Sequence, residues 1–104
     1  MKTLLTTIIA LFLTITSYSQ AYDVKKPINQ VTRQKDQSIS SISIQNEYII
    51  IHGKDSGVFK IKEISKDNTY YYAESQLEVI SITLNNGKGT YKNLTTNKTI
   101  TFNY

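Results

Sequence analysis

The 104-residue sequence contains no cysteine and no tryptophan, and it has one proline, one methionine and one histidine. Without cysteine the chain cannot form a disulfide, a thiolate metal site or a lipid-modified cysteine. One histidine gives no support for a structural zinc site either. A small domain without disulfides must be held together by its core, by closure of its sheet or by association with another copy.

Charge of one sign is not concentrated anywhere in the chain. Twelve Lys and Arg residues and eight acidic residues give a net charge of +4. The lysines are spread out and nowhere form a cluster of five, whereas a nucleic-acid-binding surface requires a basic patch or stripe. We therefore expect no nucleic-acid partner.

Residues 1–19 have the pattern of a cleaved secretory signal peptide. Lys2 supplies the positive charge, a short apolar run follows, and Ser17 and Ser19 are the small residues before the cleavage site. At about a dozen residues the run is shorter than the roughly 20 that a spanning helix needs. We expect export to the periplasm or the extracellular medium, with no stable membrane span after cleavage. An uncleaved membrane anchor is the alternative.

The 85 residues after this segment have an all-β composition. They include twelve Ile, four Val, eight Thr, seven Tyr and two Phe but only three Leu and two Ala. β-Branched and aromatic side chains suit a pleated, half-buried surface. Residues 20–38 lack period-2 alternation and are expected to form a polar N-terminal arm. Pro27 could open one short helix there, with Val24, Ile28 and Val31 on one face.

Residues 39–104 are expected to form one antiparallel β domain of about six to seven strands. Alternating apolar runs are separated by connections of about two to five residues, which are too short for parallel crossovers. Asn86-Gly87 is the strongest hairpin signal. The meander should close as a compact barrel or fold into a two-sheet sandwich. Its expected inward side chains are Ile42, Ile44, Ile49, Ile51, Phe59, Ile61, Tyr71, Ile80, Ile82, Leu84, Ile100 and Phe102.

The residue inventory does not favour catalysis. His52, Asp55 and Ser56 lie on one strand end and its turn, where their side chains should splay into solvent instead of forming a triad. No two carboxylates have the facing arrangement of a glycosidase, and Glu63 alone shares a face with core residues. No phosphate-binding glycine loop is present. We expect a non-enzymatic protein without catalytic residues, metal ligands or cofactors.

The most distinctive local feature is Tyr70-Tyr71-Tyr72. Alternation sends Tyr70 and Tyr72 to the face opposite Tyr71, and exposed aromatics beside lysines can contact proteins or sugars. Lys60 and Lys62 should line the same outer surface. We therefore expect Tyr70, Tyr72, Lys60 and Lys62 to bind a protein or glycan of the cell envelope.

Two other functions stay open. One is a lipocalin-like carrier that holds a small apolar ligand near Phe59, Phe102 and Tyr104 at a barrel mouth; the meander resembles small lipocalin-like barrels in architecture, without a shared motif. Pairing of exposed edge strands would instead make the protein a self-associating structural subunit, a homo-oligomer.

Overall fold

The computed structural model describes residues 19–104, and in this part of the chain the structure is all-β. Apart from Ser19, the expected signal peptide lies outside the described residues. The nine strands are β1 (Ser19–Asp23), β2 (Lys25–Asn29), β3 (Ser41–Gln45), β4 (Tyr48–His52), β5 (Gly57–Ile64), β6 (Tyr70–Glu74), β7 (Val79–Asn85), β8 (Lys88–Asn93) and β9 (Lys98–Asn103). No helix long and apolar enough to cross a membrane occurs in residues 19–104.

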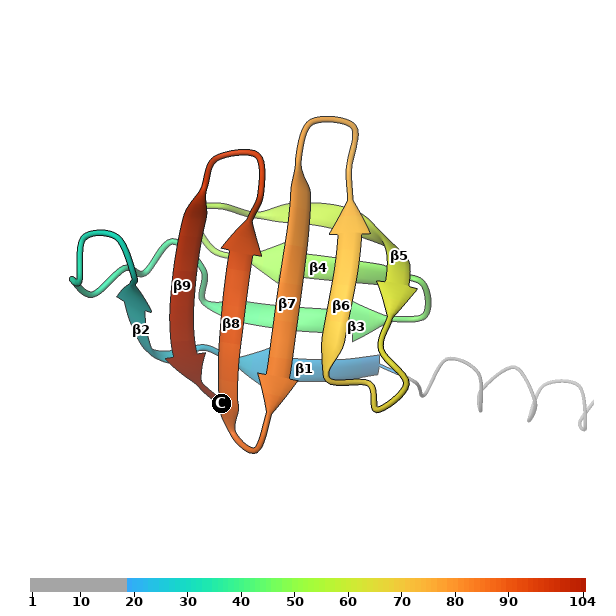
Figure 1. The fold of residues 1–104 in the computed structure, drawn as a ribbon, viewed down its shortest axis with the longest axis horizontal. Helices are drawn as coiled ribbons and strands as arrows, with labels where there is room; N and C mark the ends of the chain where they lie inside the picture. Colours follow the sequence, from blue (N-terminus) through green and yellow to red (C-terminus); the bar gives the residue numbers. More distant parts are fainter. Residues whose placement is uncertain (1–18) are drawn as a thin grey trace, which may run out of the picture.

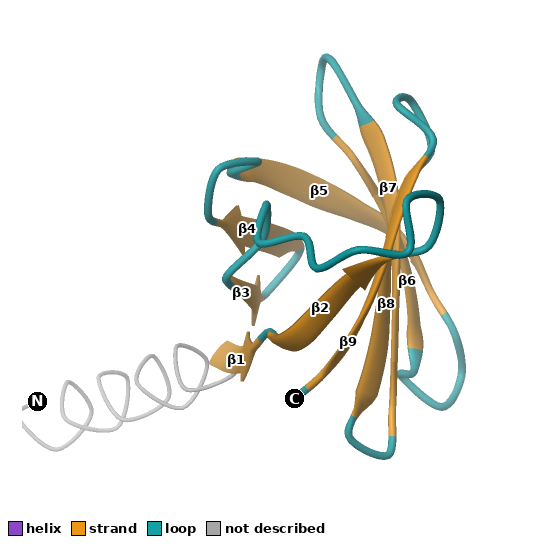
Figure 2. Cartoon of the chain, turned by 90° about the vertical axis from the view of Figure 1, so that its left-hand side faces the viewer, coloured by secondary structure: helices purple, strands orange, loops and turns teal. Residues whose placement is uncertain are grey.

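The strands form one antiparallel sheet in the order β1-β3-β4-β5-β6-β7-β8-β9-β2. Strands β3 to β9 follow chain order, so the expected meander is confirmed. Strands β1 and β2 occupy opposite edges of the sheet, yet Val24 alone separates them in sequence. This bent N-terminal segment brings the two edges together, and the sheet is nearly closed as a barrel. The strands β1, β3 and β4 run across β6 to β9, and β5 leads from one layer to the other (Figures 1 and 2).

Residues 20–38, expected to form a polar arm that could contain one short helix, include two strands and no helix. Strand β1 pairs with β3 and β2 pairs with β9, so the sheet begins at Ser19 and not at residue 39. Pro27 lacks an amide hydrogen, and the pairing of β2 shifts register between Lys25 and Ile28. Lys26 has a positive φ of 51° at this irregularity. The irregularity explains why the segment shows no clear alternation in the sequence.

Asparagine supplies the left-handed residue at four of the turns. Asn46, Asn68, Asn86 and Asn97 have φ values between 52° and 62°. Asn tolerates this region because its short side chain can hydrogen-bond locally. At Asn86-Gly87 both residues have positive φ, as a type I′ hairpin requires. The expected hairpin at this position is confirmed.

The core fills the space between the two layers. Eleven of the twelve expected inward side chains are buried, and Ile61 is partly buried against them. Sequence reasoning missed three further core residues, Ile39, Ala73 and Tyr91. Gly89 lies opposite Phe102 on the neighbouring strand. A Cβ atom at Gly89 would come closer to the Phe102 ring than van der Waals contact allows. The ring therefore occupies the space that the missing side chain leaves.

A bulge in β5 changes the face of Glu63. The pairing of β5 with β6 shifts register between Ile61 and Glu63. A bulge inserts one extra residue, so the residues after it change sides relative to simple alternation. Glu63 consequently lies opposite Tyr72 and is exposed instead of sharing the core face of Phe59.

Candidate functional site

An open groove lies on the outer face of β4, β5 and β6. Cross-strand pairing places Tyr48 opposite Lys60, and Lys60 opposite Glu74. The turn after β6 completes one wall. The groove has a volume of about 680 Å³, and its lining residues are Tyr48, Val58, Lys60, Lys62, Glu74, Ser75, Gln76 and Leu77.

The groove combines exposed apolar side chains with lysines. Leu77 is 85% exposed, Val58 57% and Tyr48 44%. Lys62 pairs with Glu74 at 3.5 Å between Nζ and Oε1, an exposed pair that water and salt screen. Lys60 has no ion-pair partner within residues 19–104. The result is an apolar centre with one available positive charge beside it.

The four residues predicted to bind on the surface lie on this outer face but not all at one point. Lys60 and Lys62 line the groove. Tyr72 lies farther along the same face, half-buried between Glu63 and Ser81. Tyr70 is 38% exposed and sits opposite Thr83. The two lysines therefore line the groove, whereas Tyr70 and Tyr72 are not among its lining residues.

Sequence reasoning missed Tyr48, Val58 and Leu77 as groove residues. Tyr48 and Val58 alternate with buried residues, which does mark them as outward-facing. Nothing in the sequence indicates that the turn carrying Leu77 lies beside them. An exposed leucine in a polar turn, between Gln76 and Glu78, is the signal that could have been used.

The three residues predicted for a barrel mouth do not form one mouth. Phe59 and Phe102 are buried, and they lie in different parts of the interior. Phe102 packs with Tyr104 at a ring centroid distance of 6.4 Å, and Tyr104 meets Tyr22 edge-on at 5.0 Å. We call this cluster of Phe102, Tyr104, Tyr22 and the adjacent Tyr71 the aromatic end.

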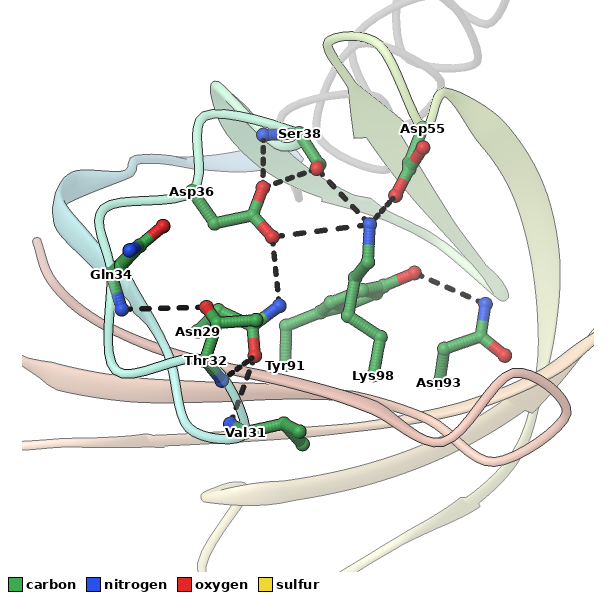
Figure 3. Close-up of polar contacts among 10 residues, drawn as sticks. All are labelled: Asn29, Val31, Thr32, Gln34, Asp36, Ser38, Asp55, Tyr91, Asn93 and Lys98. Atoms are coloured by element: carbon green, nitrogen blue, oxygen red, sulfur yellow. Dashed lines mark hydrogen bonds and ion pairs between the residues drawn. The ribbon is translucent and has the colours of Figure 1, made fainter.

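Phe59 instead lies near what we call the polar end, the cluster of Asn29, Asp36, Ser38, Asp55, Glu78, Tyr91, Asn93 and Lys98. Figure 3 shows Lys98 of β9 reaching two loops. Its Nζ donates to Asp55 Oδ2 at 2.9 Å and to Ser38 Oγ at 3.1 Å. Asp36 Oδ2 lies 3.9 Å from the same nitrogen. One lysine thus joins three segments far apart in sequence.

Ionisation at the polar end follows from these contacts. Hydrogen bonds from Ser38 and Asn29, with a smaller contribution from the charge of Lys98, lower the pKa of Asp36 to about 2. The hydrogen bond to Asp55 raises the pKa of Lys98. Both groups are therefore charged over the whole neutral range.

Two buried asparagines have the same role in this cluster. Asn29 Oδ1 accepts from the amides of Val31 and Thr32, and its Nδ2 donates to Asp36 at 3.0 Å.

Asn93 repeats this arrangement on β8. Its Oδ1 accepts from the amides of Thr95 and Thr96 at 3.0 Å each, and its Nδ2 donates to Glu78. Each asparagine caps a turn and donates a hydrogen bond to a carboxylate, so hydrogen bonds connect both turns to the acidic residues of the polar end.

The polar side chains that could suggest catalysis are engaged elsewhere. His52 Nε2 lies 3.2 Å from Ser43 Oγ of the neighbouring strand, and Asp55 is held by Lys98. His52 and Asp55 thus have different partners and are not joined in a relay. Residues 19–104 contain no group of three or more His, Cys, Asp or Glu side chains that could hold a metal ion.

No protein-family model, curated protein or solved structure matches this chain. The groove and the polar end are therefore the features of the molecule that bear on its function.

Proposed function

We propose that this protein is a small exported, non-catalytic β-barrel domain that binds a partner protein of the cell envelope through the groove on β4 to β6. The observation that carries the proposal is the grouping of Tyr48, Val58 and Leu77 around an open groove bordered by Lys60. Interfaces combine an apolar centre with a polar rim, and their centres are depleted of charge. The pattern of residues 1–19 supports export.

A protein fits this groove better than a glycan does. Three of the lining side chains are large, apolar and exposed, and only Tyr48 is aromatic. A protein surface offers the apolar side chains that these residues would bury at about 25 cal/mol per Å². A carboxylate on the partner would pair with Lys60, whose charge is not used within the described residues. We expect the Lys60 contribution to weaken as salt is added.

Site-specific photo-crosslinking in the producing cells tests the proposal. A crosslinking amino acid at Leu77 should give one discrete adduct with a partner protein, identified by mass spectrometry. The matched control carries the same group at Lys92, an exposed residue on the outer face of β8, and should give no such adduct. Val58→Asp should remove the Leu77 adduct, because it places a charge at the centre of the apolar surface.

Each alternative has its own outcome. An adduct of twice the monomer mass that contains only this chain would replace the partner with a second copy. A protein-free adduct with a polysaccharide would assign the groove to a glycan. Equal labelling from positions 77 and 92 would show that the groove is not a specific site, provided that both variants keep the amide spectrum of the folded protein.

A further inference from the structure

The polar end contains a second pocket, separate from the groove on the outer face. It has a volume of about 420 Å³, within the range of small-molecule sites, which is about 300–1,000 Å³. Two buried aromatic residues, Phe59 and Tyr91, line it from inside the barrel. The other lining residues are Lys54, Asp55, Ser56, Glu78, Asn93, Thr96 and Lys98.

Several hydrogen-bonding groups around this pocket are available to a ligand. Within residues 19–104 the side chains of Lys54, Ser56 and Thr96 make no hydrogen bond or ion pair. Asp55 and Glu78 each use one carboxylate oxygen, for Lys98 and Asn93 respectively, and keep the other.

The Tyr91 hydroxyl is the most informative of these groups. Tyr91 is only 1% exposed, and its hydroxyl accepts a hydrogen bond from Asn93 Nδ2 at 3.3 Å. It donates none within the described residues. Buried hydroxyls normally satisfy their hydrogen as well. A ligand oxygen in the pocket would provide the missing acceptor.

The charges of the lining residues cancel. Lys54 and Lys98 are balanced by Asp55 and Glu78, so the pocket gives no net electrostatic attraction to a ligand of either charge that would offset the loss of its hydration. A neutral ligand with many hydroxyl groups has no charge to desolvate, and it can both donate to the carboxylates and accept from Lys54 and Tyr91. Its less polar face would lie toward Phe59. A neutral sugar has these properties.

We propose that the pocket at the polar end binds a neutral saccharide unit, with the Tyr91 hydroxyl donating to a sugar oxygen and Asp55 and Glu78 accepting from sugar hydroxyls. This site is distinct from the groove on β4 to β6, and the proposal does not depend on the protein partner of that groove.

An NMR titration of the ¹⁵N-labelled protein tests the proposal with three sugars that share the same ring and differ in charge. Glucose is neutral, glucuronate carries a negative charge and glucosamine a positive one. Addition of glucose up to about 100 mM, which detects affinities in the millimolar range, should shift the amide signals of Tyr91, Asn93 and Thr96. The two charged sugars should bind several-fold more weakly. Maltose should bind at least as tightly as glucose if the ligand is part of a longer glycan.

Variants that remove single hydroxyls link the binding to this pocket. Tyr91→Phe should weaken glucose binding about 2- to 10-fold, the loss expected for one hydrogen bond. Tyr22→Phe at the aromatic end, away from the lining of this pocket, is the matched control and should leave binding unchanged. If Tyr91→Phe disturbs the fold, Thr96→Val at the exposed rim gives the same test. Absence of shifts with any sugar, or tighter binding of a charged sugar than of glucose, would overturn the proposal.

Discussion

Strand β9 and the residue after it place a lysine at one end of the barrel and two aromatic rings at the other. Its inward side chains are Lys98, Ile100 and Phe102, Tyr104 follows directly after the strand, and Ile100 is fully buried between the two ends. Lys98 is held by directional hydrogen bonds to two loops, whereas Phe102 and Tyr104 are held by ring packing. Lys98 and Phe102 are four residues apart on the strand, a distance of about 13 Å.

The two ends of the barrel are stabilised by different forces. Ring packing at the aromatic end depends on shape, and it should not respond to changes of pH near neutrality or of salt concentration. The polar end depends on charge and on the complete set of hydrogen bonds, so losing one member leaves the others unsatisfied. Changes in volume should therefore affect the aromatic end most, and changes in charge the polar end.

The largest expected effect is at Gly89 of the aromatic end. Gly89→Ala places a methyl group where the Phe102 ring lies, and the ring must move within a packed core. We expect a loss of about 3 kcal/mol in the free energy of unfolding, measured by urea denaturation.

Gly57→Ala near the polar end is the matched control for this substitution. Its Cβ would meet the edge of the Phe59 ring at 3.0 Å, which requires a small movement only. We expect a loss of about 1 kcal/mol. Equal losses for the two variants would show that Phe102 is not packed more tightly than Phe59, and the proposed difference between the ends would fail.

The next effect concerns Asp36 of the polar end. Its pKa of about 2 in the folded protein lies below the ordinary value of 3.8. A carboxyl group with a lowered pKa stabilises the fold above pH 4, and this stabilisation is lost as the pH falls through 2. The loss amounts to about 2 kcal/mol. Asp36→Asn should lower stability at pH 7 and flatten the stability curve between pH 4 and pH 2.

Two further variants separate the causes of this shift. The hydrogen bonds from Ser38 and Asn29 lower the Asp36 pKa more than the charge of Lys98 does. Ser38→Ala should therefore raise the Asp36 pKa more than Lys98→Met, as measured by ¹³C NMR of the carboxyl carbon. The reverse order would mean that the polar end is held mainly by charge attraction.

The difference between the ends also explains what the sequence could predict. Phe102 was correctly placed in the core because period-2 alternation is local and continues to the end of the chain. Strands β3 to β9 were predicted for the same reason, since each hairpin has its own turn signal. The polar end joins Lys98 to Ser38 and Asp55, which are 60 and 43 residues away. No local pattern contains such pairs.

The missed features have the same origin. Strands β1 and β2 exist because distant strands offer them edges, and their own residues lack a clear period. One wall of the groove is the turn that carries Leu77. The order of the strands in the sheet alone places this turn beside Tyr48. The bulge at Ile61 and Glu63 likewise has no residue signature, so alternation placed Glu63 on the wrong face.

The smallest expected effect distinguishes the tyrosines of the two ends. Burial raises the pKa of Tyr71 and of Tyr91, and charges on neighbouring groups add to this effect. For Tyr71 the added charges are those of Tyr22 and Tyr104 at the aromatic end. For Tyr91 a hydrogen bond from Asn93 acts in the opposite direction. Because a raised phenol pKa favours the neutral form, ionisation above pH 10 should destabilise the fold at both ends.

Tyr104→Phe should separate the two ends without a large change in volume. Removing this hydroxyl removes one of the charges that raise the pKa of Tyr71, so the Tyr71 pKa should fall while that of Tyr91 stays constant. A ¹³C NMR titration of the tyrosine ring carbons resolves the two residues and requires no tryptophan correction, since the chain has none. A shift of Tyr91 equal to that of Tyr71 would mean that the ends are electrostatically coupled through the barrel. Ile100 and its apolar neighbours would then not insulate Lys98 and its partners from the ring cluster, and the two ends would have to be treated as one unit.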